Sequence, residues 1–210
     1  GTSYGGIFMR SSSKYNEIYN NSCEYSDIFS GYSSAFNTII HNEILNGTYG
    51  IYVYSMANNN EILNNTVLNC NYGIRASNSY YIDITDNIVK NSDLYGINLA
   101  YPNDYNISQN YVQNCNRGIY SYGAGQDNIL SSNEISESEI VDIELKDSDK
   151  WNISENNMEE RGIILQNVFQ NHIDQSNLIE GKPLYYFEDT NNLNLDGNIL
   201  SDVGQIILLN

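Results

Sequence analysis

The sequence predicts an all-β protein, a single-stranded right-handed parallel β-helix (solenoid) of about nine coils with roughly 22 residues in each. Three observations predict it. A short motif centred on asparagine recurs along the chain, a Gly-Ile pair recurs in phase with it, and the residues after the pair alternate between apolar and polar. Each coil would lie on the preceding one, so that like positions form ladders along the axis. The right hand follows from the general preference of parallel crossovers.

The asparagine motif consists of an aliphatic residue, two further residues, Asn, one residue and a second aliphatic residue. Successive copies lie 20 to 23 residues apart. A sharp bend favours a residue that tolerates positive φ, and an inward amide can donate and accept hydrogen bonds along the stack. We therefore expect one structural ladder at Asn21, Asn42, Asn65, Asn87, Asn110, Asn133, Asn156, Ser176 and Asn198.

The Gly-Ile pair marks the start of a strand. The pair begins at positions 6, 50, 73, 96, 118 and 162, and Asp142-Ile143 fills the same slot. Because side chains alternate along a strand, Ile51 would point inward and Tyr52 outward. A repeat of this length leaves room for three short strands and three bends, and no window shows the apolar stripe of a helix. We expect one domain over residues 1–210.

Charge and hydropathy each exclude one class of partner. The chain has 26 acidic and nine basic side chains, a net charge of -17, and about one residue in six is asparagine. Such a chain repels phosphate backbones, so nucleic acid is not expected as a partner. No apolar run approaches the roughly 18 residues of a membrane span, and the chain does not open on a signal-peptide pattern. Membrane insertion by this segment is therefore not expected.

Both ends of the chain fall inside a coil. Solenoids normally carry polar caps on their terminal repeats. We therefore expect this chain to be a module or fragment of a longer protein. Open strand edges at the coil ends would also favour self-association.

The coils resemble the right-handed parallel β-helix repeats of the NosD-like and carbohydrate-active β-helix proteins, a group common among bacterial and archaeal surface proteins. The resemblance runs from Tyr4-Gly5-Gly6-Ile7 to the end of the chain. Near the C-terminus the chain is similar to a run often found in that family, over Gly181-Lys182-Pro183-Leu184-Tyr185-Tyr186-Phe187, then 192–197 and 203–208. The family includes lyases, hydrolases, epimerases, a periplasmic copper-maturation protein and non-enzymatic surface domains, so the resemblance implies the fold more strongly than a function.

Catalytic signatures of such proteins are missing from the sequence. Polygalacturonase-like hydrolases carry Asn-Thr-Asp, Asp-Asp, Gly-His-Gly and Arg-Ile-Lys segments, and an epimerase-like site carries Asp-Pro-His-Asp; none of these occurs. The four arginines fall on different coils, which gives no support to a lyase site. The alternative catalytic candidates are Glu61 and Asp83, at equal phase on adjacent coils and roughly 5 Å apart, a spacing that suits a glycosidase pair. A solvated acidic surface is the simpler interpretation.

No cofactor is predicted, apart from a weak candidate calcium site. Carboxylates close together could bind calcium, which prefers oxygen ligands, although no EF-hand or Gly-rich Asp repeat is present. The candidate ligands are Asp142, Glu144, Asp147 and Asp149. Zinc and copper are not expected, because His41 and His172 lie about six coils apart and the cysteines show no paired spacing.

The cysteines are expected to be free thiols. Cys70 and Cys115 share a phase, but one coil lies between them and separates them by roughly 10 Å. A disulfide needs Cα atoms within about 7 Å. Cys23 completes an odd count, and all three fit the role of small core residues.

Tyrosine is the remaining signal for function. Three rings precede the Gly of the landmark on consecutive coils, and four more are expected to point outward from the strand that follows. Outward rings with polar tips suit contact with polysaccharide or a neighbouring surface protein, whereas a purely structural stack is the alternative. These ligand-binding candidates are Tyr49, Tyr72 and Tyr95, then Tyr52, Tyr54, Tyr120 and Tyr122.

Two function classes follow. The favoured one is a non-catalytic module of a cell-surface or extracellular protein, adhesin-like or part of an envelope layer, that presents Tyr and Asn ladders. The alternative is a polysaccharide lyase or glycoside hydrolase of the β-helix type. The missing catalytic signatures favour the first class.

Overall fold

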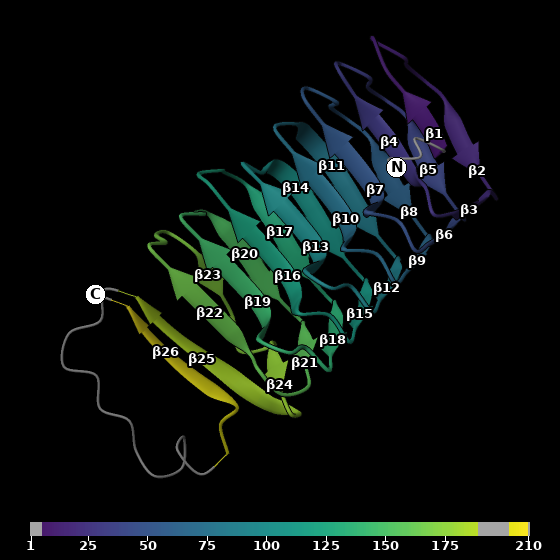
Figure 1. Cartoon of the computed structure of the whole chain (residues 1–210). Helices are drawn as coiled ribbons and strands as arrows, with labels where there is room; N and C mark the ends of the chain where they lie inside the picture. The colour runs from purple at the N-terminus through teal and green to yellow at the C-terminus, as the bar shows by residue number, and fades with distance from the viewer. Residues whose placement is uncertain (1–5, 189–201, 210) are drawn as a thin grey trace.

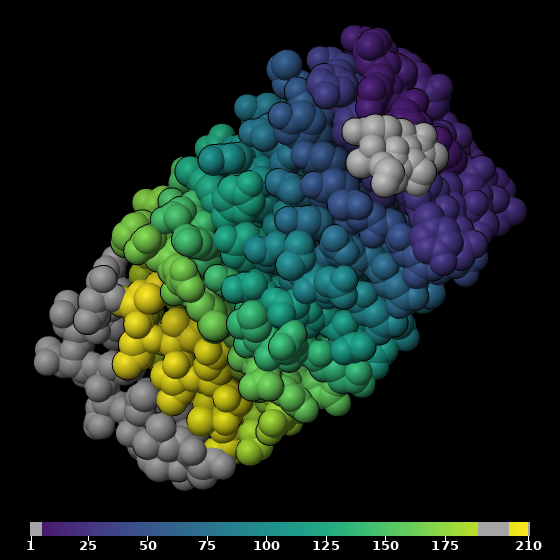
Figure 2. All heavy atoms as spheres, in the orientation of Figure 1, coloured from purple at the N-terminus to yellow at the C-terminus, as the bar shows by residue number. Residues whose placement is uncertain are grey.

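The computed structural model describes residues 6–188 and 202–209. In this part of the chain every coil contributes one strand to each of three sheets, and successive coils stack along one axis (Figure 1). The space-filling view shows the same order as bands of colour that follow one another along the long axis (Figure 2). The protein is a right-handed parallel β-solenoid, so the predicted fold class is confirmed.

The three sheets take their strands in turn from each coil. The first sheet contains β1 (Gly6–Met9), β4 (Asp27–Gly31), β7 (Tyr49–Tyr54), β10 (Tyr72–Ser77), β13 (Tyr95–Ala100), β16 (Arg117–Tyr122), β19 (Val141–Lys146) and β22 (Ile163–Gln166). The second contains β2 (Glu17–Tyr19), β5 (Thr38–Ile40), β8 (Glu61–Leu63), β11 (Tyr80–Thr85), β14 (Asn103–Ser108), β17 (Asn128–Ser131), β20 (Trp151–Ser154) and β23 (His172–Ile173). The third contains β3 (Ser22–Glu24), β6 (Glu43–Leu45), β9 (Thr66–Leu68), β12 (Ile88–Lys90), β15 (Tyr111–Gln113), β18 (Glu134–Ser136), β21 (Asn157–Met158), β24 (Leu178–Ile179), β25 (Lys182–Glu188) and β26 (Gln205–Leu209).

The described residues form eight complete three-stranded coils, close to the nine expected. After the eighth coil the chain reverses, because β25 pairs antiparallel with β24 and then parallel with β26. The ninth expected motif, centred on Asn198, lies outside the described residues. Among the described residues, no helix is long and apolar enough to cross a membrane.

Inward side chains form one continuous apolar core, because the coils pair with like residues opposite one another. The rows are fully buried in all three sheets. They run through Ile28, Ile51, Ile74, Ile97, Ile119 and Ile143 in the first sheet, Ile39, Ile62, Ile84, Ile107, Leu130 and Ile153 in the second, and Ile44, Val67, Val89, Val112, Ile135 and Met158 in the third.

The Gly of the Gly-Ile pair lies where two sheets approach closely. A Cβ atom built at Gly73 would lie 2.3 Å from Val89 Cγ1 and 2.4 Å from the carbonyl oxygen of Gly96. Gly50 and Gly96 have the same kind of surroundings on their own coils. At Gly50, Gly73 and Gly96 the landmark therefore reflects a lack of space and not a need for positive φ, whereas Gly6 and Gly162 have positive φ.

The asparagine ladder lies at the bend between the second and third sheets. Each Oδ1 accepts hydrogen bonds from the backbone N–H and the side-chain amide of the Asn one coil earlier. At Asn87 these bonds from Asn65 measure 2.9 and 3.0 Å, and the Asn87 amide donates to the Ile62 carbonyl at 2.8 Å. The bonded series runs through Asn21, Asn42, Asn65, Asn87, Asn110, Asn133, Asn156 and Asn177.

Two details of the ladder differ from the expectation. The eighth position is filled by Asn177 and not by Ser176, because the turn after β23 is one residue longer; the Ser176 hydroxyl instead accepts the Glu155 N–H at 2.7 Å. Positive φ falls on the residue before each ladder Asn from Asn21 to Asn156. That residue is Asn20, His41, Asn64, Asp86, Gln109, Ser132 or Glu155, with φ between 51 and 57°. The amide bonds, and not positive φ, therefore account for Asn at these positions.

A second row of amides lies at the bend that precedes the second sheet. Asn37 Oδ1 accepts the Asn16 N–H at 3.0 Å, and Asn60 Oδ1 accepts the Asn37 N–H at 2.9 Å. Further along the axis the row continues through Ile82, Tyr105, Asn128, Trp151 and Asn171, so apolar side chains interrupt it. The sequence signal was an Asn five residues before a ladder Asn, as in the pair Asn37 and Asn42.

Candidate functional site

The outward side of the first sheet gathers most of the predicted ligand-binding residues. We call this surface the tyrosine face. Its parallel register places outward side chains in straight rows across the coils. One row runs through Phe8, Phe29, Tyr52, Arg75, Asn98, Tyr120 and Glu144, and the adjacent row through Tyr49, Tyr72, Tyr95 and Arg117, with Tyr54 and Tyr122 beside them.

The rings of the tyrosine face contact one another across four strands. The centroids of Tyr49 and Tyr72 are 5.0 Å apart, those of Tyr72 and Tyr95 5.5 Å, and those of Tyr95 and Tyr120 4.9 Å, all in stacked geometry. Tyr52 stacks on Tyr49 at 4.7 Å. Stacked aromatic pairs add stability beyond the area that they bury, so this series also stiffens the sheet.

All seven predicted tyrosines are half-buried, with one side open to solvent. Burial raises the pKa of Tyr52, although a hydrogen bond to Ser77 opposes this effect. Burial also raises the pKa of Tyr120, with a further contribution from the neighbouring Tyr95 and Glu144. Both hydroxyls therefore stay protonated near neutral pH and can donate hydrogen bonds to a ligand.

Arginines lie over the rings of this face. The Arg75 guanidinium lies 5.2 Å from the Tyr72 ring centroid and 5.3 Å from that of Tyr52. Arg117 lies 5.7 Å from the Tyr95 centroid, and Arg10, near the N-terminal end, 5.1 Å from that of Phe8. Cation–π attraction holds a guanidinium in such positions. Three of the four arginines of the chain lie on this one surface.

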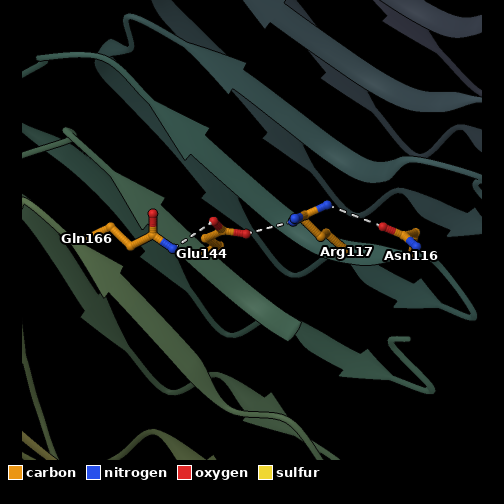
Figure 3. A network of polar contacts seen from close by, with 4 residues as sticks. All are labelled: Asn116, Arg117, Glu144 and Gln166. Carbon is orange, nitrogen blue, oxygen red and sulfur yellow. Dashed lines mark hydrogen bonds and ion pairs between the residues drawn. The ribbon is translucent and has the colours of Figure 1, made fainter. Parts of the chain in front are cut away.

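One of these arginines has a carboxylate partner. Arg117 Nε donates to Glu144 Oε2 at 2.7 Å, and its Nη1 donates to Asn116 Oδ1 at 3.3 Å (Figure 3). Gln166 donates to the other Glu144 oxygen at 3.4 Å. The Glu144 side chain is only 8% exposed, so the charge of Arg117 compensates a nearly buried carboxylate.

The alternative catalytic pair lies on the second sheet. Glu61 and Asp83 are direct neighbours in the pairing of β8 with β11, as their equal phase predicted. They line a depression of about 360 Å³ together with Thr38, whose hydroxyl donates to Glu61 at 3.2 Å. Three exposed rings that the sequence interpretation did not single out complete its wall: Tyr15, Phe36 and Tyr81.

Those three rings project from backbone positions with positive φ, Tyr15 and Phe36 in bends and Tyr81 near the start of β11. Tyr15, Phe36 and Tyr81 have φ values of 59, 56 and 56°. Bulky residues rarely adopt this conformation, which costs them free energy that Gly would not lose. The sequence signal was an aromatic residue just before the second row of inward residues, as in Tyr15-Asn16 and Phe36-Asn37.

The four calcium candidates are not brought together. Asp142 is completely buried, and its Oδ2 accepts the N–H groups of Arg161 and Gly162, each at 2.8 Å. Glu144 pairs with Arg117, Asp147 accepts the Asn167 amide and Asp149 accepts the Phe169 N–H. No group of three or more His, Cys, Asp or Glu side chains in the described part of the chain could hold a metal ion.

A protein-family model described as NosD, periplasmic copper-binding protein, matches residues 23–158 and 94–202. The chain belongs to the NosD family. The resemblance noted in the sequence is thereby confirmed. Comparison of this NosD-family chain with curated proteins gave no match.

Solved structures similar to this NosD-family chain include two β-helix proteins. The Dettilon tailspike protein has 17% sequence identity and a TM-score of 0.57, and the match covers 94% of this chain and 50% of the tailspike. An alginate lyase from Paenibacillus has 10% identity and a TM-score of 0.44, over 73% of this chain and 75% of the lyase. The chain spans half the length of the tailspike, and at this identity the likeness shows the fold alone.

The described residues do not fit the copper that the family description names. His41 lies at the bend after β5 and His172 on β23, six coils further along. Cys23, Cys70 and Cys115 are buried free thiols, as predicted, and Ser92 lies between the last two. Burial raises the pKa of the Cys70 thiol to about 11, which disfavours the thiolate that a metal would need.

Proposed function

We propose that this NosD-family chain is a non-catalytic binding module of an extracellular or cell-surface protein. In this proposal the tyrosine face contacts polysaccharide or a neighbouring surface protein. The observation that carries the proposal is the series of stacked rings from Tyr49 to Tyr120, half-open to solvent across four strands. The periplasmic description of the family supports a location outside the cytoplasm.

The shape of the face suits a long ligand better than a small one. Small-molecule sites are concave and bury most of their ligand, whereas this surface offers shallow contacts that repeat at about 4.8 Å from coil to coil. A polymer that lies along the axis could contact several rings at once, and many weak contacts would add to a useful affinity. Tyrosine provides both an apolar ring and a hydroxyl for such contacts.

Replacing Tyr52 and Tyr120 together by Ala is expected to weaken ligand binding about tenfold or more, since two stacked rings of the face are lost. The measurement begins with a glycan array, on which the unchanged protein should bind at least one polysaccharide. Titration calorimetry then compares the dissociation constants of the two proteins for that ligand.

The matched control replaces Tyr80 and Tyr111, which lie on the second and third sheets, by Ala. This control also removes two tyrosine side chains, but at positions away from the tyrosine face. It should leave the dissociation constant unchanged. Equal losses in both double variants, at equal thermal stability, would contradict the proposed role of the tyrosine face.

A second candidate function is polysaccharide cleavage at Glu61 and Asp83. The specific observation in its favour is that the two carboxylates are paired across adjacent coils inside a depression walled by exposed rings. One carboxyl could protonate the leaving oxygen while the other acts as nucleophile or base.

The substitutions Glu61→Gln and Asp83→Asn distinguish polysaccharide cleavage from non-catalytic binding. We expect neither the original protein nor the two variants to release reducing ends or unsaturated products from any polysaccharide that binds, and we expect binding to be unchanged. Cleavage by the original protein that disappears in both variants would establish the second candidate in place of the first.

A further inference from the structure

The tyrosine face differs from the rest of the surface in charge. The whole chain has nine basic against 26 acidic residues, but the strands of the first sheet carry three of each: Arg75, Arg117 and Lys146 against Asp27, Asp142 and Glu144. The strands of the second sheet carry four acidic residues and neither Lys nor Arg. Screening in physiological salt reduces the influence of charges more than about 8 Å away. An anion approaching this face would therefore meet mainly its local charges.

Arg75 and Arg117 occupy similar surroundings with one difference. Both guanidinium groups lie over tyrosine rings at 5.2 to 6.0 Å. Arg117 also binds the Glu144 carboxylate, whereas the Arg75 side chain makes no hydrogen bond or ion pair with any described residue. Its row neighbours are Tyr52 and Asn98, neither of which is acidic.

Tyrosine rings and the sheet cover the Nε side of the Arg75 guanidinium. Its Nε is buried without a hydrogen-bond partner, and the rings of Tyr49, Tyr52 and Tyr72 surround the group. The Arg75 side chain is half-buried, and no hydrogen bond to a described residue occupies its terminal nitrogens, which offer paired donors. A planar fork of this kind matches a carboxylate, which can accept two parallel hydrogen bonds.

We propose that Arg75 is a carboxylate-binding site and that the ligand of the tyrosine face is a polysaccharide containing uronic acid. The sugar carboxylate accepts hydrogen bonds from the terminal nitrogens of Arg75 and so gives this arginine a carboxylate partner, as Glu144 does for Arg117 through Nε, while the sugar ring packs on Tyr49 or Tyr72. The inference rests on the proposed function and narrows it to one class of ligand. Arg10, exposed over Phe8 and Phe29, provides a second cation toward the N-terminal end of the same face.

The test compares each acidic oligosaccharide with its own methyl ester, which removes the charge and keeps the sugar. The probes are oligomers of galacturonate, glucuronate and mannuronate, titrated against the full chain at fixed ionic strength. We expect at least one acid to bind about tenfold more tightly than its ester. Exchanging Arg75 for Gln should abolish that preference and leave the affinity for the ester unchanged.

Two further variants make the test specific. Arg161→Gln removes the same charge from an exposed position without ring contacts and should keep the preference. Arg75→Lys keeps the charge but lacks the planar guanidinium, so it should retain only part of the preference for the acid over the ester. Equal melting temperatures would show that all variants fold.

Each outcome separates this inference from the broader proposal. If esters and acids bind equally in the original protein, or if Arg75→Gln weakens both to the same extent, the carboxylate site is wrong and the binding module stands. If none of the oligosaccharides binds, the uronate assignment fails, and glycan-array binding decides whether the proposed function fails with it.

Discussion

Replacing Asn87 by Leu is expected to lower the free energy of unfolding by about 1–3 kcal/mol. Asn87 is 1% exposed; its Oδ1 accepts two hydrogen bonds, and its two amide N–H groups are shared among three acceptors. Leucine fills a similar volume but leaves the buried Asn65 N–H without its acceptor in the core. Urea unfolding of the two proteins measures the difference.

Asn106→Leu provides the control for this substitution. Asn106 lies on β14, one coil after Asn87, and its half-buried side chain makes no hydrogen bond with any described residue. The same chemical change should therefore alter the free energy of unfolding by less than about 0.5 kcal/mol. Equal effects at the two positions would show that the amide ladder contributes nothing specific.

Replacing Gly73 by Ala is expected to destabilise the protein by about 3 kcal/mol, because one added methyl group has no room. Its Cβ would overlap Val89 Cγ1 at 2.3 Å and the Gly96 carbonyl oxygen at 2.4 Å. The valine could turn aside, but the carbonyl belongs to the next coil and cannot move without disturbing the pairing of β10 with β13. Thermal and urea unfolding report the loss.

Gly181→Ala is the control that distinguishes two causes of destabilisation, lack of space for a Cβ atom and an unfavourable backbone conformation. Gly181 has φ of +73°, and nothing lies within 4 Å of a Cβ built there. Alanine at this position should cost about 1 kcal/mol, from conformation alone. A larger loss at Gly181 than at Gly73 would mean that backbone conformation limits substitution more strongly than the contact between sheets.

The fold could be predicted from the sequence because its two landmarks report inter-coil contacts directly. A ladder Asn bonds to the Asn of the next coil, so the same residue type recurs from coil to coil. Four of the landmark glycines, Gly50, Gly73, Gly96 and Gly118, each lie against a side chain and a carbonyl of neighbouring strands. The second amide row could not be found in this way, since Ile82, Tyr105 and Trp151 fill the same position on other coils. Apolar packing replaces amide bonding there.

The candidate site was predicted only in part. Alternation along the strands placed the tyrosines on the outward side, and equal phase placed Glu61 beside Asp83. The pairing of Arg117 with Glu144 could not be read from phase, because Arg117 is in register with Val141 and the long side chains meet diagonally. The contrast between a paired and an unpaired arginine therefore required coordinates.

The register brings Tyr49, Tyr72 and Tyr95 into one row, so each coil adds one more set of outward residues to the tyrosine face. Gain or loss of a whole coil would preserve the cross-section of the core, since each coil contacts only its neighbours. It would change how many rings and cations are offered to a polymer, and hence the avidity, without altering any individual contact. Gene duplication within such a chain could thus adjust the strength of adhesion in discrete steps, while point substitutions on the outward rows adjust the choice of ligand.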